Sequence, residues 1–235
     1  MTAPSIPLGE PVHTNPAPRP ERRRLEGRHV VLEPFVIANH AADIYAASAG
    51  AANESLWAYL GQGPFADLDS FVEYYAVAAT RDDPLLFAII DRQSGRAVGH
   101  ATFMRIVPGD RVVEVGNILF TPALQHTVGA TEAMYLMARH VFDDLGYRRY
   151  EWKCNALNAP SRRAALRLGF TFEGIFRQHM ILKGRNRDTA WFSMLDSEWP
   201  SARAAFEGWL ADDNFTPDGR QRRSLAAIRA ADAGA

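Results

Sequence analysis

The sequence predicts an α/β fold of the α+β kind, built on a mixed sheet. Short apolar runs bounded by turn residues recur between positions 29 and 120, which is typical of antiparallel strands. Apolar residues then recur at helical spacing over 130–145. A strand, a short helix and another strand follow over 148–182, and such a crossover places parallel strands beside the antiparallel ones.

The composition excludes several classes of protein. The chain has 235 residues, of which 47% are apolar, and its net charge of −1 gives no general affinity for nucleic acid or membrane surfaces. Cys154 is the only cysteine, so we expect neither an internal disulfide nor a metal site. No run approaches the ~18 apolar residues of a membrane span and the chain begins without an apolar leader, so we expect a cytoplasmic protein.

A flexible arm is predicted at the N-terminus, before the first helices. Residues 1–24 hold six prolines and end in three arginines, which favours a mobile, solvated segment. The apolar run 29–34 predicts a strand that stops at its proline. Three helical stretches are then expected. The first is Ala-rich and covers 39–49, and the second is a short turn or helix over 54–60. The third covers 70–80 and is capped by an aspartate at 67 or 69.

An antiparallel meander and a long helix form the middle of the chain. Turns at 93–96 and 108–110 separate three predicted strands, at 85–90, 97–106 and 111–120. The helix predicted over 130–145 is closed by Gly146.

The last part of the chain alternates strands and helices. A strand over 148–155 points Tyr150, Trp152 and Cys154 to one face and charged residues to the other. A short helix follows, capped by Asn158 and stopped by Gly169. We expect a hairpin of strands 170–182 and 186–195, a closing helix over 201–210, and a frayed tail beyond 212, so that 201–235 lies outside the domain of 25–200.

The run from Asn155 to Gly174 carries the most specific motif. It reads Asn-x-x-Ser, a helix, and then Gly-Phe-x-x-Glu-Gly. Asn158 and Ser161 are the first and last residues of Asn-x-x-Ser, and Gly169 begins the second pattern. This run resembles the last motif of the GNAT N-acetyltransferases, in the branch that contains the ribosomal-protein N-terminal acetyltransferases. The resemblance covers about 25–200 and implies the GNAT fold: a mixed, mostly antiparallel central sheet, splayed in the middle to admit acetyl-CoA, with helices on both faces.

The resemblance also implies an acetyl-CoA site. Backbone N–H groups at the start of the long helix would hold the pyrophosphate, in the run Gln125, His126, Thr127, Val128, Gly129, Ala130 and Thr131. A valine stands at the family's first glycine, so the loop must use ordinary dihedrals there or shift toward the next residue. The pantetheine arm would lie between the backbone of Leu119 and Phe120 and the side chain of Asn158.

The proton carriers complete the predicted site. Many GNAT enzymes use a tyrosine at the position that is Ala165 here, so that route is closed. The resemblance to this branch implies the serine of the motif instead, Ser161, whose alternative role is that of a capping hydroxyl. Glu114 lies on an apolar strand, where a carboxylate is either paired with a cation or used as a base. In this branch a glutamate is the proposed base, and its position here is Met180, so that glutamate is absent. The neighbouring His179 would need a bulge to reach the same face.

Two kinds of function fit these residues. In the first, the protein moves an acetyl group from acetyl-CoA to a protein N-terminus, through an open groove, or to a small amine, in a closed acidic pocket. In the second, it binds acyl-CoA without turnover, as the missing tyrosine and the valine suggest. Either a monomer or a homodimer is compatible with the sequence. The acceptor would contact His179 and aromatic side chains, each of which is more often core: Trp57, Tyr59, Phe65, Phe103 and Trp191.

Overall fold

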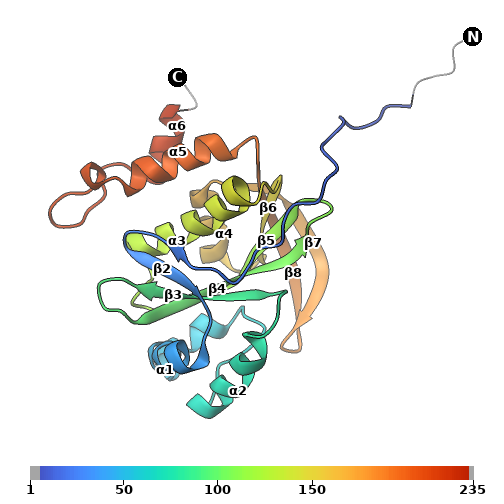
Figure 1. Ribbon diagram of the computed structural model, residues 1–235. Coiled ribbons are helices and arrows are strands. Elements are labelled where there is room, and N and C mark those ends of the chain that lie inside the picture. The colour runs from blue at the N-terminus through green and yellow to red at the C-terminus, as the bar shows by residue number, and fades with distance from the viewer. Residues whose placement is uncertain (1–5, 233–235) are drawn as a thin grey trace, which may run out of the picture.

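One sheet of eight strands organises the part of the chain that the computed structural model describes, residues 6–232 (Figure 1). The strand order is β1-β2-β3-β4-β5-β6-β8-β7, and the β5–β6 pair alone is parallel among these neighbours. The strands are β1 (Leu25–Glu26), β2 (Val30–Pro34), β3 (Leu85–Asp91), β4 (Ala97–Val107), β5 (Val112–Phe120), β6 (Arg149–Asn155), β7 (Thr171–Leu182) and β8 (Arg185–Leu195). The mixed, mostly antiparallel sheet is therefore confirmed.

Helices cover both faces of this sheet, as predicted (Figure 1). None of the helices described is both long and apolar enough to cross a membrane. Their bounds are α1 (Ile37–Ser48), α2 (Leu68–Ala78), α3 (Val128–Arg139), α4 (Ala159–Leu168), α5 (Trp199–Leu210) and α6 (Leu225–Asp232), with 3-10 turns η1 (Ala51–Trp57) and η3 (Asp212–Asn214) and a π turn η2 (His140–Asp144). The long helix predicted over 130–145 thus begins earlier and ends in a widened turn.

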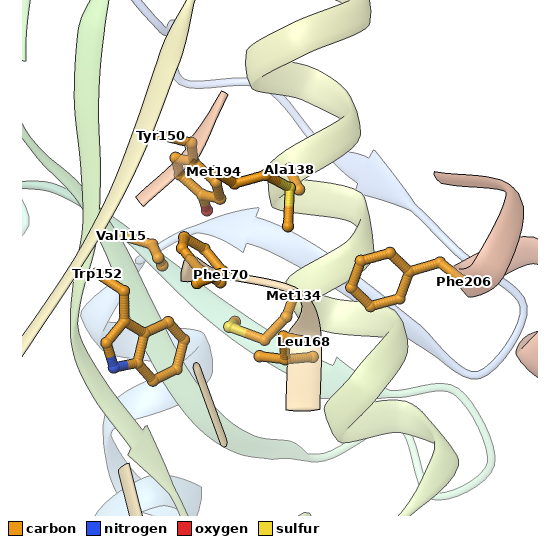
Figure 2. Close-up of a pocket in the computed structure, with 9 residues that line it drawn as sticks. All are labelled: Val115, Met134, Ala138, Tyr150, Trp152, Leu168, Phe170, Met194 and Phe206. Carbon is orange, nitrogen blue, oxygen red and sulfur yellow. The ribbon is translucent and has the colours of Figure 1, made fainter. Parts of the chain in front are cut away.

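The larger core lies between the sheet and α3, α4 and α5. Figure 2 shows its centre, where side chains from three strands face the helices. No space wide enough for a water molecule remains among them, so this crevice is packed interior and not a ligand site. Its lining residues are Val115, Met134, Ala138, Tyr150, Trp152, Leu168, Phe170, Met194 and Phe206.

The buried carboxylate of Glu132 joins α3 to the edge of the sheet. Its two oxygens accept hydrogen bonds from the backbone N–H groups of three successive residues, at 2.7 Å from Arg28, 2.6 Å from His29 and 2.8 Å from Val30. The glycine before them, Gly27, leaves room for this carboxylate, since a Cβ there would lie 2.5 Å from it. Glu132 therefore fixes where β2 begins against the helix.

The N-terminal arm and the tail differ from their predictions. The second half of the arm packs on the domain: the Ala17 N–H donates to the Pro108 carbonyl at 3.1 Å, and Arg22 donates to two carbonyls beside α2. The tail beyond 212 is not frayed throughout, because α6 packs on α5 through Leu225 and Ile228. Proline content suggested a mobile arm, but the arm and the tail both find partners in the fold.

The smaller core, under α1 and α2, contains a buried histidine. The Nε2 atom of His100 lies 2.7 Å from the Tyr75 hydroxyl, and burial lowers the pKa of His100 to about 4. The unfolded chain, with a histidine pKa of ~6.5, therefore binds this proton first. We expect the free energy of unfolding to fall as the pH falls from about 6.5 to about 4, with His100 contributing about 3 kcal/mol of the loss.

Urea unfolding across that pH interval tests this expectation. His100→Gln cannot titrate there, so its profile should be flatter than the profile of the unchanged protein by the amount that His100 contributes. Two further histidines, His40 and His140, also have pKa values lowered by burial and are present in both proteins. Parallel profiles would show that His100 is protonated in the folded state as readily as in the unfolded one.

Candidate active site

A gap between β5 and β6 opens the middle of the sheet. The two strands pair from Val112 and Arg149 as far as Val115 and Trp152, and not beyond, although β5 runs on to Phe120. A bulge bends β5 at this point, because Asn117 has a φ of 48° and the pairing of β5 with β4 shifts its register. Main-chain groups of residues 116–120 therefore face the gap without a strand partner on that side.

The start of α3 lies beyond the end of β5 and presents main-chain donors. Thr127 caps the helix by accepting from the Ala130 N–H at 3.2 Å, and the N–H groups of Val128 and Gly129 have no partner within the helix, as in any first turn. Val128 takes ordinary dihedrals, and the left-handed residue is instead His126, with a φ of 61°. The valine at the family's first glycine position therefore removes none of the backbone N–H donors of residues 125–131.

Three other residues of the predicted acetyl-CoA site have specific roles. The Gln125 side chain donates to the Phe120 carbonyl at 2.9 Å, which ties the run to the end of β5. Gly129 lets α3 approach the sheet, since a Cβ there would lie 2.8 Å from a methyl group of Val30. The Thr131 hydroxyl is buried and accepts a hydrogen bond from Arg167 at 3.0 Å. It therefore belongs to the packing between helices, whereas we expected it to contact the pyrophosphate.

The start of α4 borders the gap from the β6 side. Asn158 is the predicted cap, and its side-chain oxygen accepts from the Ser161 N–H at 3.1 Å. The Ser161 Oγ accepts from the indole N–H of Trp152 at 3.0 Å, and Trp152 is the last β6 residue paired with β5. This hydroxyl therefore lies where the strands begin to part, beside the buried Cys154 thiol, and it has one proton to donate.

A cluster of charged side chains lies on the opposite face of the sheet. Glu114 is 4% exposed, and its Oε2 lies 3.0 Å from Lys153 Nζ and 3.3 Å from Arg105 Nε. Burial raises the pKa of the Glu114 carboxyl, and the two cations only partly offset this. Both readings of Glu114 thus apply, since it is paired and its pKa is also shifted toward the range of a base. We call Arg105, Glu114, Lys153, His179 and Arg187 the Glu114 cluster.

Bulges in two strands aim two members of this cluster. The Asp83 carboxylate accepts from the N–H groups of Arg105 and Ile106, at 2.8 and 2.9 Å, and so holds the bulge in β4 where Arg105 has a φ of 48°. In β7 the register shifts between Phe176 and Met180, and Asp188 holds that bulge by accepting from the Gln178 N–H at 2.7 Å.

His179 lies on the face of the cluster because of the β7 bulge. Its Nδ1 is 2.9 Å from the Thr189 hydroxyl, and its ring packs beside Trp191. Partial burial and the nearby Arg105, Arg187 and Lys153 charges lower the pKa of His179, so its ring is neutral at neutral pH. Simple strand alternation placed this histidine on the wrong face, and the bulge corrects that expectation.

The predicted aromatic wall is only partly present. Trp57 is 2% exposed within the smaller core, with its indole N–H bonded to the Ser48 carbonyl, and Phe103 is fully buried in the larger core. Phe65 packs edge-to-face against Trp57 and Phe71. Tyr59 and Trp191 remain as candidates, and the Trp191 ring lies 3.8 Å from Lys153 Nζ. Trp57 and Phe103 are therefore structural residues.

Two side chains, which we call the Tyr59–Lys183 bridge, join the loop after η1 to neighbouring loops. The Tyr59 hydroxyl donates to the Leu157 carbonyl at 3.3 Å, which joins the loop after η1 to the loop before α4. From the β7–β8 turn, Lys183 Nζ donates to the carbonyls of Trp57 and Gly63 at 2.8 and 2.6 Å. Sequence reasoning missed Lys183 and Lys153, although they are the only lysines in a chain with 26 lysine and arginine residues.

The fold and this site together define an acetyltransferase. The chain belongs to the GNAT family, because the model of the acetyltransferase (GNAT) domain matches residues 29–171. The solved structure of a GCN5-related N-acetyltransferase from Brucella melitensis has 49% identity and a TM-score of 0.90, over 92% of this chain and 98% of that one. An acetyltransferase of the GNAT family from Chromobacterium violaceum has 38% identity and a TM-score of 0.77, over 84% of this chain and 100% of that one.

Two Vibrio cholerae structures share the fold at lower identity. One is described as a ribosomal-protein-serine acetyltransferase, with 16% identity, a TM-score of 0.62, and 74% of this chain and 97% of that chain covered. The other is a spermidine N-acetyltransferase in complex with CoA and spermine, with 18% identity, a TM-score of 0.59, and 73% and 98% covered. The comparison with curated proteins gives no match.

Proposed function

We propose that the protein transfers an acetyl group from acetyl-CoA to a primary amine by direct transfer in a ternary complex at the β5–β6 gap. The gap itself is the observation that supports this most strongly. It separates Ser161 and the starts of α3 and α4, on one face, from Glu114 and His179 on the other. Acetyl donor and acceptor amine would thus approach from opposite faces and meet between the parted strands.

The residues present suit acetyl-CoA, which would supply the acetyl thioester. The free N–H groups of Val128 and Gly129 would hold the pyrophosphate at the positive end of the α3 dipole. Main-chain groups of 116–120 that have no β6 partner, in the stretch with Leu119 and Phe120, and the side chain of Asn158 would hold the pantetheine arm, although the Phe120 carbonyl already accepts from Gln125.

Two proton transfers are needed on the protein's side. An alkyl amine has a pKa of ~10 and must lose a proton before or as its nitrogen bonds to the acetyl carbon. Glu114 would accept that proton, with neutral His179 as the second candidate. When the carbon–sulfur bond breaks, the Ser161 hydroxyl would pass its proton to the leaving thiolate and regain one from solvent, so that the serine ends neutral. The hydrogen bond from Trp152 polarises that hydroxyl.

Ser161→Ala should lower kcat about 10- to 100-fold, the lower part of the range for acid–base catalysis, because a thiolate is a good leaving group. The KM for acetyl-CoA should change little, since the Asn158 side chain and the main-chain donors remain. Ser161→Thr keeps the hydroxyl and should retain most of the rate. Steady-state kinetics separate the two constants, and a loss confined to KM would leave Ser161 only its capping role.

The function itself is tested by acetyl-CoA turnover over a panel of peptides and small amines. Release of the free thiol gives the rate, and mass spectrometry of the acceptor confirms N-acetylation. A thermal shift measures coenzyme binding separately, since a ligand at 100 times its Kd stabilises a protein by ~2.7 kcal/mol. Binding without product from any amine would favour the non-catalytic alternative.

The identity of the amine is open between two classes. Structures described as acting on a ribosomal protein and on spermidine both share the fold, at 16% and 18% identity. The Tyr59–Lys183 bridge ties the loop after η1 to the loop before α4 and to the β7–β8 turn, and such cross-links would favour a small acceptor over a peptide laid along an open groove.

A further inference from the structure

The Glu114 cluster is basic, where a pocket for a small cationic amine was expected to be acidic. Its ion pairs continue along β6 as one network in which each cation touches a carboxylate. Lys153 Nζ lies 2.7 Å from Glu151, and Arg149 pairs with both Glu151 and Glu173, at 2.7 and 2.5 Å. Three cations thus match three carboxylates, namely Arg105, Lys153 and Arg149 with Glu114, Glu151 and Glu173.

Arg187 is a fourth cation beside this network, and among residues 6–232 no carboxylate lies within ion-pair distance of it. Within residues 6–232, no side chain forms an ion pair or a hydrogen bond with its guanidinium, and its Nε is buried without an acceptor. Burial lowers the pKa of Arg187. A buried donor without an acceptor is costly, and a guanidinium is built to bind a planar oxyanion through two parallel hydrogen bonds.

The position of Arg187 connects it to the reaction. On β8 it alternates with Asp188 and therefore shares a face with Thr189 and Trp191, on which His179 packs. It is close enough to interact electrostatically with Glu114 and with Cys154, which lies on β6 beyond the last residue paired with β5. The guanidinium thus belongs to the cluster face of the sheet, within electrostatic range of Glu114 and on the side of β8 that His179 contacts.

We propose that Arg187 binds a carboxylate of the acceptor, so that the substrate is a small amino acid and not a polyamine or a peptide. This inference rests on the proposed function and names its substrate class. One uncompensated positive charge matches a monoanion, whereas a phosphate dianion would leave a negative excess and a polyamine would be repelled by the cations. The carboxylate on Arg187 would then hold the amine near Glu114 and His179.

Matched acceptor pairs test the inference. Thiol release from acetyl-CoA is measured with the common amino acids, with their amides, which keep the amine but lack the carboxylate, and with aminoalkyl phosphonates. We expect kcat/KM for the best amino acid to exceed that of its amide by at least tenfold. Arg187→Gln should raise the KM for that amino acid about 10- to 100-fold and leave the amide unchanged, the size expected for one charged hydrogen-bonded contact.

Two further variants control for folding and for charge. Arg187→Lys keeps the charge without the paired geometry and should retain part of the preference for the acid. Arg185→Gln removes an exposed arginine from the same hairpin and should leave the preference intact. Equal losses for acid and amide in Arg187→Gln, a change only in the KM for acetyl-CoA, or a preference for phosphonates or amides in the unchanged protein would each overturn the inference while the acetyltransferase function stands.

Binding decides the case in which no amine gives product. With CoA present, the amino acid should raise the melting temperature of the unchanged protein and not that of Arg187→Gln, and the amide should do neither. That result would reject the proposed acetyl transfer and support the binding of a carboxylate by Arg187. If acid and amide shift the melting temperature equally, or neither shifts it, the carboxylate site is rejected as well.

Discussion

Glu114→Gln should lower kcat/KM by about 10²- to 10⁴-fold, the usual contribution of a general base. The base must be deprotonated, so the unchanged enzyme should lose kcat/KM as the pH falls through the pKa of Glu114, which burial places above the ordinary glutamate value. The variant should no longer show that acidic limb. The pH dependence of kcat/KM with a fixed acceptor measures both effects.

Two companion variants assign the effect to the correct group. Glu151→Gln removes a carboxylate that also pairs with Lys153 and lies in register with Glu114 on the neighbouring strand, and it should cost less than tenfold. His179→Asn should be similarly mild if Glu114 is the base. A large loss of kcat/KM in His179→Asn with a small loss in Glu114→Gln would assign the base to the histidine. The acidic limb of the pH profile would then lie below a pH of ~6.5, because the pKa of His179 is lowered.

Glu132→Ala should destabilise the fold by about 2–4 kcal/mol, because it leaves three backbone donors without their acceptor, one of them buried at Val30. The start of β2 would also lose its connection to α3. Equilibrium unfolding in urea, followed by circular dichroism, gives the free-energy difference.

A second substitution at the same position separates the charge from the contacts. Glu132→Gln keeps one acceptor oxygen and turns an amide donor toward the N–H groups, so its loss should fall between those of the unchanged protein and Glu132→Ala. A loss below ~0.5 kcal/mol in Glu132→Ala, the size of an ordinary surface change, would mean that water replaces the carboxylate without cost.

Local signals predicted most of the elements correctly. The Asn158 cap, Gly169 and the strand after it form as the sequence indicates, because capping and left-handed turns depend on residues a few positions apart. The family resemblance rests on this same short run and is confirmed. Predictions failed where a residue's partner is distant in sequence, as for the arm at Ala17, the helix α6 and the buried Trp57.

Site residues divide in the same way. Glu114 and Ser161 stand out because each residue type is unusual or motif-bound at its position. Arg187, Lys153 and Arg105 carry no such signal in a chain rich in arginine, and their importance appears only when three strands bring them together. The side of β7 that His179 takes was likewise decided by Asp188, through a bulge that strand alternation cannot predict.

By itself, the sequence determined the family, the mixed sheet and the capped start of α4 that borders the gap, because caps, turns and hydrophobic periodicity act over a few residues. Only the tertiary structure decided the charge of the cleft and the position of its free guanidinium. Electrostatic balance is a sum over side chains from separate strands, and that sum is fixed only when register and bulges place them side by side.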